Sequence, residues 1–199
     1  MTVAHGFHGT NTRFALWVVP PPAEFKDRLN AAHSAVFLTR HLDFAQGAGL
    51  LTCEAMLRPD AKVLVPAMDR SDKLRQALLK HPIAGRCVWL QERETWRQAW
   101  NTGEATRFGA DPKFLAQFHA RAAASLQRQA PNLHPDVVSR VAANNITRGW
   151  IETVVGATRV LGYDALQGHE CDKPSEGPSI ARPWLAVLSA EALTEPVWR

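Results

Sequence analysis

The segments Gly6-Phe7-His8-Gly9-Thr10, Val36-Phe37-Leu38-Thr39 and Leu42-Asp43-Phe44-Ala45-Gln46-Gly47-Ala48 carry the signals that decide the fold. Apolar and polar residues alternate over Val3–Thr10, which predicts a β-strand. Ala35–Leu38 is a short apolar run that predicts a buried strand, and a short helix is expected from Asp43 to the glycines that follow. The chain is therefore expected to open with strands and a short helix.

Further strands are expected around this group. Arg13–Val19 predicts a strand that three prolines end, because proline cannot continue a β-ladder. Leu51–Leu57 and Ala61–Val65 predict two strands joined by the turn Arg58-Pro59-Asp60. Between the first strands, a short helix is expected to place three residues on one face: Phe25, Leu29 and Ala32.

Helical signals dominate the middle of the chain. Ser71 is expected to cap a helix, and Arg86–Leu90 to form one more strand. Residues 92–146 have apolar residues at helical spacing, with Asp111 as a cap and Pro112 in the first turn. This stretch is predicted to be a helical insertion.

The C-terminal part returns to strands. A last helix is expected over Thr147–Leu161, followed by strands over Tyr163–Leu166 and Trp184–Leu188 around a loop rich in Gly, Pro and Ser. Strands at both ends with helices between them predict an α+β fold. With 199 residues, a single domain is expected over residues 1–199, with the helical insertion at about 92–146.

Composition excludes several classes of protein. Apolar residues make up 46% and charged residues 21% of the chain, which is typical of a globular domain and argues against disorder. No apolar run reaches the roughly 18 to 20 residues that span a bilayer, and no signal peptide is recognised, so a cytoplasmic location without a membrane partner is expected. Three widely spaced cysteines support neither a disulfide framework nor a zinc ribbon, and no metal site is expected.

A mild basic bias permits a phosphate-bearing partner. The formal net charge is +4, and residues 107–148 hold six cations against Asp111 and Asp136. A solvated helix face is the alternative interpretation of this stretch. Nucleic-acid stacking is a second possibility, because tryptophans and arginines alternate nearby. The six cations are Arg107, Lys113, Arg121, Arg128, Arg140 and Arg148.

The first strand ends in a combination of residues suited to ligand binding. His8 and Thr10 offer hydrogen-bonding groups, and Gly9 has no side chain to keep a ligand away from the backbone. A glycine turn beside a structural histidine is the alternative interpretation.

The same residues resemble the first motif of the ADP-ribosyltransferase superfamily, in the branch that contains diphtheria toxin, exotoxin A and the poly-ADP-ribose polymerases. The resemblance implies a split mixed β-sheet, and it implies that His8, Gly9 and Thr10 hold NAD. Residues 36–48 are similar to the second motif, in which an aromatic residue stacks on nicotinamide. On that match Phe37 takes the place of the first tyrosine.

The resemblance also has departures. Ala48 stands near the family's second tyrosine and cannot stack, so Phe37 and Phe44, or a tryptophan, are expected to substitute for the usual pair of tyrosines. The C-terminal strands resemble those of bacterial members, in which a catalytic glutamate lies at or just before the last strand. Trp184 stands at that place here, so the catalytic acid is assigned to Glu176 or to Glu170 in the preceding loop.

The resemblance implies an NAD-dependent mono-ADP-ribosyltransferase of toxin or effector type, which transfers ADP-ribose to a protein or nucleic acid. Ala48 and Trp184 support a second interpretation, a member that binds NAD, protein or nucleic acid without transfer. NAD hydrolysis, with water as the acceptor, is a third.

Overall fold

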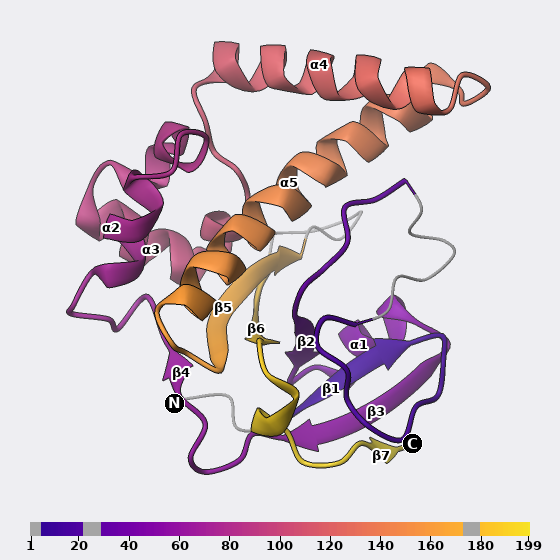
Figure 1. Ribbon diagram of the computed structural model, residues 1–199, viewed down its shortest axis with the longest axis vertical. Coiled ribbons are helices and arrows are strands. Elements are labelled where there is room, and N and C mark those ends of the chain that lie inside the picture. The colour runs from indigo at the N-terminus through magenta and orange to yellow at the C-terminus, as the bar shows by residue number, and fades with distance from the viewer. Residues whose placement is uncertain (1–4, 22–28, 173–179) are drawn as a thin grey trace.

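A seven-stranded mixed sheet forms one side of the molecule, in the order β4-β5-β6-β2-β1-β3-β7 (Figure 1). The computed structural model describes residues 5–21, 29–172 and 180–199. All neighbouring strands in these ranges are antiparallel except β4 and β5. The strands are β1 (His5–Thr10), β2 (Val36–Thr39), β3 (Leu51–Met56), β4 (Val63–Leu64), β5 (Ala165–Asp172), β6 (Ile180–Val187) and β7 (Val197–Trp198).

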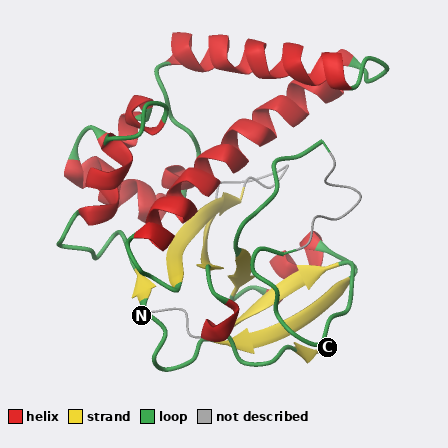
Figure 2. Cartoon of the chain, in the orientation of Figure 1, coloured by secondary structure: helices red, strands yellow, loops and turns green. Residues whose placement is uncertain are grey.

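The longer helices gather at one end of the molecule, as Figure 2 shows, whereas the short helix α1 lies apart from them beside β1. In the view of Figure 1, α5 runs past β5. Helix α4 lies across the top of the view, where it meets the N-terminal part of α5. The described α-helices are α1 (Leu42–Ala48), α2 (Lys73–Leu79), α3 (Arg93–Thr102), α4 (Pro112–Gln129) and α5 (Pro135–Val160). The predicted α+β class and the predicted helical stretch in the middle of the chain are confirmed.

Two hydrophobic cores lie on opposite faces of the central strands. Along β2, Val36 and Leu38 belong to one core, whereas Phe37 packs against the other. This alternation follows from the period of two in a β-strand. The core on the Phe37 side contains side chains of α2, α3 and α5, and the core on the other side is closed by Trp17, Ala192 and their neighbours.

Two strand predictions are wrong. Residues 11–21 form no strand, because the indole of Trp17 packs into the core beside Val36 and donates a hydrogen bond to the carbonyl of Thr194 at 2.8 Å. Arg86–Leu90 falls in two short 3-10 helices, Ala84–Arg86 and Val88–Leu90. Their buried residues repeat every third position, at Ala84, Cys87 and Leu90, which suits a 3-10 turn and not a strand.

Three helix predictions need correction. Asp72, with φ of 60°, precedes α2 in place of Ser71. The last helix begins at Pro135 and not at Thr147, since one buried stripe continues through Val138, Ala142, Ile146, Trp150 and Val154. The predicted insertion therefore ends inside α5. The helix expected around residues 25–32 lies partly outside the described residues, and residues 29–34 are not helical.

Candidate functional site at the junction of strands 1 and 2

Strands β1 and β2 are neighbours that barely pair. Their register contains the single pair Phe7↔Thr39, whereas β1 and β3 share six pairs and β2 and β6 share four. Just past that pair, Nδ1 of His8 lies 3.0 Å from the carbonyl oxygen of Phe37. Because a carbonyl only accepts, Nδ1 carries the proton and donates. A side chain thus connects the two strands where the backbone ladder has ended.

The backbone of Gly9 faces this junction. The carbonyl of Thr52 accepts from the backbone N–H of Arg199 and so points away from β1. Backbone groups alternate in direction along a strand, so those of Cys53 point toward β1 and pair with His8, its register partner. The N–H and C=O of Gly9 therefore point the other way, toward β2, beyond the last register pair.

Helix α1 forms a wall beside Gly9. A Cβ atom at this position would lie 1.9 Å from the carbonyl oxygen of Ala45, so only glycine permits so close an approach. The absent side chain thus has a structural reason, which is the packing of α1 against β1. Helix α1, and not a ligand, therefore occupies the space that the missing side chain leaves.

The ring of His8 lies among aromatic side chains. Its centroid is 5.6 Å from that of Trp17 and 6.3 Å from that of Phe14. The hydroxyl of Thr10 lies 3.3 Å from both the carbonyl oxygen and the backbone nitrogen of Thr12, so it participates in a local turn. Trp17 was not expected at this site, and no short motif around it signals such a role.

Phe37 corrects one expectation. The resemblance assigns both His8 and Phe37 to NAD, but their rings lie on opposite faces of the two neighbouring strands and do not line one cleft. The Phe37 ring packs 4.9 Å from the ring of His33 and 5.5 Å from that of Trp184, in the core on the helical side. Alternation along β2 sends this ring away from His8 and leaves its carbonyl at the junction.

Phe44 and Glu170, two other predicted site residues, lie on neighbouring elements away from His8. The guanidinium of Arg182 lies 5.8 Å from the ring centroid of Phe44 and 3.1 Å from a carboxylate oxygen of Asp43, both on α1. Glu170 on β5 is the register partner of Arg182 on β6. Strand pairing places Arg182 beside Glu170, and the tertiary fold brings α1 next to Arg182.

Of the two glutamates predicted as the catalytic acid, only Glu170 lies among the described residues. Three strand-to-strand steps separate β5, which carries Glu170, from β1, which carries His8. At 4.7–4.9 Å per step the two strands lie about 14 Å apart. Glu176 lies outside the described residues. Trp184 is in register with Thr39, at the level where β1 and β2 pair, and carries no carboxylate.

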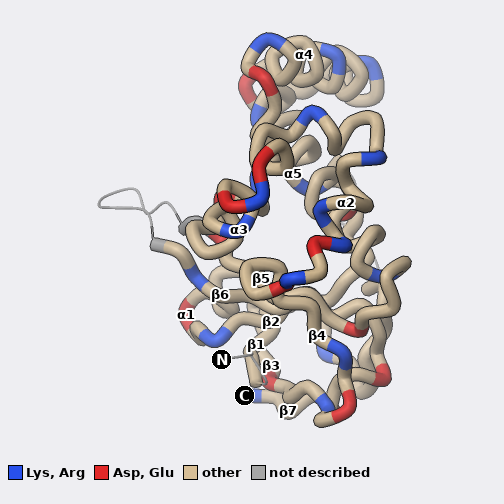
Figure 3. The backbone as a smooth tube through the Cα atoms, turned by 90° about the vertical axis from the view of Figure 1, so that its left-hand side faces the viewer, with Lys and Arg blue, Asp and Glu red and all other residues tan. Residues whose placement is uncertain are grey.

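Three further observations concern the predicted partners and the predicted absence of a metal site. Lys and Arg lie along α4 and α5 (Figure 3), and nothing in this arrangement identifies a phosphate-bearing partner. The described residues contain no group of three or more His, Cys, Asp or Glu side chains placed to hold a metal ion. None of the described helices is both long and apolar enough to cross a bilayer.

Comparison of the chain with protein-family models, curated proteins and solved structures finds no match. The geometry of the β1–β2 junction and the sequence motifs around it are thus the features that bear on function.

Proposed function

We propose that the chain binds NAD at the β1–β2 junction and transfers its ADP-ribose to a macromolecular acceptor, as ADP-ribosyltransferases do. One observation carries the proposal: the N–H and C=O of Gly9 face the junction past the pair Phe7↔Thr39, beside a His8 ring that is held on the Phe37 carbonyl. A strand edge of this kind offers one donor and one acceptor, which complement the oxygen and the amino group of a primary carboxamide such as nicotinamide.

The sheet supports the same proposal. The interruption of pairing between β1 and β2 separates β4-β5-β6-β2 from β1-β3-β7, as expected for a split sheet. Helix α1 follows β2 directly and packs on Gly9, so the motif residues 36–48 lie next to the motif residues 6–10.

The transfer step needs a carboxylate. Breaking the bond between ribose and nicotinamide develops positive charge on the ribose, and a negative group placed beside it lowers the barrier. Glu176 is our first candidate for this group, and Glu170 the second. Such a preorganised group contributes about 2.7 to 4 kcal/mol to catalysis, or a hundredfold to a thousandfold in rate.

Binding without transfer is the second candidate function. It is favoured by Trp184 at the strand position where the acid was expected and by Ala48 near the position of the family's second tyrosine. This second function covers binding of NAD, protein or nucleic acid, and where the ligand is NAD the two functions differ only in the chemical step.

Thermal unfolding with and without NAD tests the shared step. A ligand that binds only the folded chain stabilises it by RT ln(1 + [L]/Kd), about 2.7 kcal/mol at a hundredfold excess. NAD should raise the Tm, and His8→Ala should reduce the increase, whereas His119→Ala on α4 should not. An unchanged Tm of the folded wild type at millimolar NAD would refute NAD binding.

Nicotinamide release tests the chemical step. The wild type should release nicotinamide from NAD, and Glu176→Gln should lose most of kcat while retaining NAD binding, because the ribosyl charge exists only near the transition state. Glu170→Gln is measured beside it, and water, protein and nucleic acid are compared as acceptors. If NAD binds but no acceptor supports release, the non-catalytic function holds and transfer is rejected.

A further inference from the structure

A cavity lies near the β4 edge of the sheet, away from the β1–β2 junction, where the chain after β4 separates from β5. β4 pairs with only the first two residues of β5, Ala165 and Leu166, although β5 continues to Asp172. Beyond them a cavity of about 250 Å³ adjoins β5 residues 167–169. Its other walls are Val65, Ala67 and Met68 after β4, and Trp100 and Asn101 near the end of α3.

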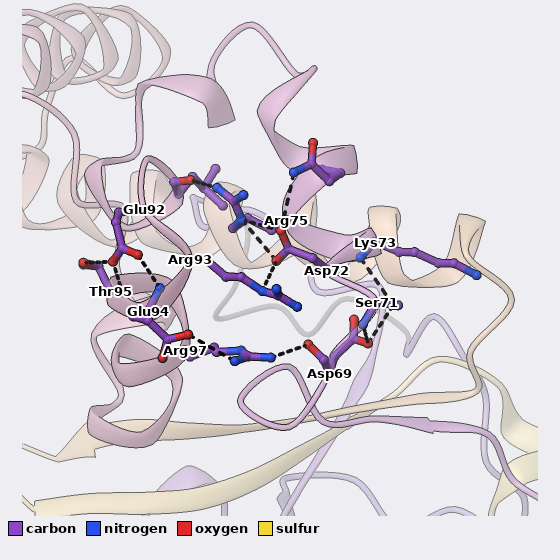
Figure 4. Close-up of polar contacts among 12 residues, drawn as sticks. Asp69, Ser71, Asp72, Lys73, Arg75, Glu92, Arg93, Glu94, Thr95 and Arg97 are labelled. Carbon is purple, nitrogen blue, oxygen red and sulfur yellow. Dashed lines mark hydrogen bonds and ion pairs between the residues drawn. The ribbon is translucent and has the colours of Figure 1, made fainter.

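One face of α3 builds this cavity. Arg93 and Arg97 reach from α3 to the segment that follows Met68, where their guanidinium groups donate to the carbonyls of Arg70 and Asp69. Figure 4 shows the contact between Arg97 and Asp69. Trp100 and Asn101 lie one turn further along the same face, since residues at positions i, i+4, i+7 and i+8 share a side of a helix. The arginines thus fix the outer wall relative to the residues that line the cavity.

His169 contributes an imidazole in a defined tautomer. Its Nδ1 lies 3.0 Å from the carbonyl oxygen of Trp100. A carbonyl only accepts, so Nδ1 is the protonated nitrogen and Nε2 of the neutral ring carries a lone pair. No described residue makes a hydrogen bond to Nε2. The cavity wall therefore contains an oriented acceptor that the described protein groups do not use.

Gly168 sets the shape of the inner wall. A Cβ atom there would lie 2.8 Å from the Trp100 ring and 2.9 Å from the Trp184 ring, so glycine lets the indole of Trp100 lie against β5. Trp100 is 2% exposed, and its indole N–H has no hydrogen-bond partner among the described residues. Buried donors without a partner are rare in folded proteins, and ligand sites are one place where they occur.

The chemistry of the walls limits the ligand. No lining residue carries a permanent charge, so a charged ligand would lose its hydration without a compensating partner. The volume far exceeds the 10–15 Å³ that a water molecule needs, and it falls just short of the roughly 300 Å³ at which drug-sized sites begin. An uncharged ligand with one ring system fits these limits.

We propose that this cavity binds an adenine base, free or within a nucleoside. An adenine edge presents an amino donor next to a ring-nitrogen acceptor. The donor complements Nε2 of His169, and a primary amide such as that of Asn101 pairs with both groups of an adenine edge. The apolar side chains of Val65, Ala67 and Met68 cover the ring. This site is separate from the β1–β2 junction and does not depend on NAD binding there.

Titration of the isotope-labelled full chain with adenine, adenosine and uridine, followed by NMR, tests the proposal. Adenosine should shift the side-chain amide signal of Asn101 and the backbone signals of residues 167–169, and uridine should not. His169→Asn retains a donor near Nδ1 for the Trp100 carbonyl but removes the Nε2 acceptor, so the Kd should rise about tenfold, the equivalent of one hydrogen bond. His119→Asn is the matched control.

A second variant keeps the test independent of His169. Ala67→Leu fills the cavity and should abolish binding while the backbone spectrum away from it stays unchanged. Adenine binding as tightly as adenosine would identify the free base as the ligand, and tighter adenosine binding would identify the nucleoside. Absence of shifts at millimolar adenine and adenosine would overturn the proposal, and so would shifts that both variants leave unaltered.

Discussion

Nδ1 of His8 lies 3.0 Å from the carbonyl oxygen of Phe37, across two strands whose backbone ladder has a single register pair. This contact joins residues 29 positions apart and holds the imidazole at the edge where the Gly9 backbone faces β2. It is the structural relationship on which the proposed site depends.

Removing the His8 contact should loosen the junction. His8→Ala eliminates one hydrogen bond, worth about 0.5–1.5 kcal/mol, together with ring packing on Trp17. His8→Asn places an amide donor near the position of Nδ1 and should cost less. Urea unfolding of both variants measures the difference, and equal stability of the two would contradict a role for the Nδ1 hydrogen bond.

A methyl group at Gly9 should displace α1. Gly9→Ala brings a Cβ within 1.9 Å of the Ala45 carbonyl, and overpacking of this kind costs about 1–3 kcal/mol. Gly47→Ala is the matched control, because its Cβ would meet nothing within 4 Å and alanine favours helix by about 0.5–1 kcal/mol. Hydrogen exchange in α1 should therefore speed up in the first variant and slow in the second.

Acid should weaken the attachment of α5 to the segment before β2. Burial alone would raise the pKa of Glu152, but hydrogen bonds from His33 and Ser34 outweigh it and hold this pKa below its ordinary value of 4.5. With a lower pKa in the folded state, the unfolded chain binds the proton more readily. The stability from Glu152 is thus present above about pH 4.5 and is lost as pH falls through the folded-state pKa.

Replacing the carboxylate tests this assignment. Glu152→Gln should lower the free energy of unfolding at pH 7 and reduce its decrease between pH 5 and pH 3, as measured by urea unfolding. Glu104→Gln is the control, because the Glu104 side chain makes no hydrogen bond or ion pair among the described residues. A pH profile of Glu152→Gln that matches the wild type would contradict the prediction.

Two buried thiols should resist chemical modification. Burial raises the pKa of Cys53 to about 11, despite an opposing hydrogen bond from its own backbone, and burial also raises the pKa of Cys87. Because the thiolate is the reactive form, both should stay unmodified by an aromatic disulfide reagent at pH 8 in a Cys171→Ser background. Both should react on unfolding in urea. Rapid reaction in the native state would show that either site opens readily.

The sequence alone indicated most of the elements that position the site. Alternating residues before Thr10, the apolar run at 35–38 and the glycines after Gln46 predicted β1, β2 and α1. Residues 13–19 have the same local strand pattern, but Trp17 is drawn into the core beside Val36, so side-chain packing replaces a ladder there. Local pattern cannot tell whether a strand finds a neighbour to pair with.

Local physical chemistry thus determined the α+β class, the positions of the central strands and the residues at the end of β1, because periodicity, caps and turn residues act over a few positions. Only the tertiary structure decided that the Phe37 ring belongs to the helical core while its carbonyl meets His8. It also decided that Arg182 lies against Phe44, and that β5 extends beyond the end of β4 next to α3. These outcomes depend on strand order and register, which are set by the packing of residues far apart in the chain.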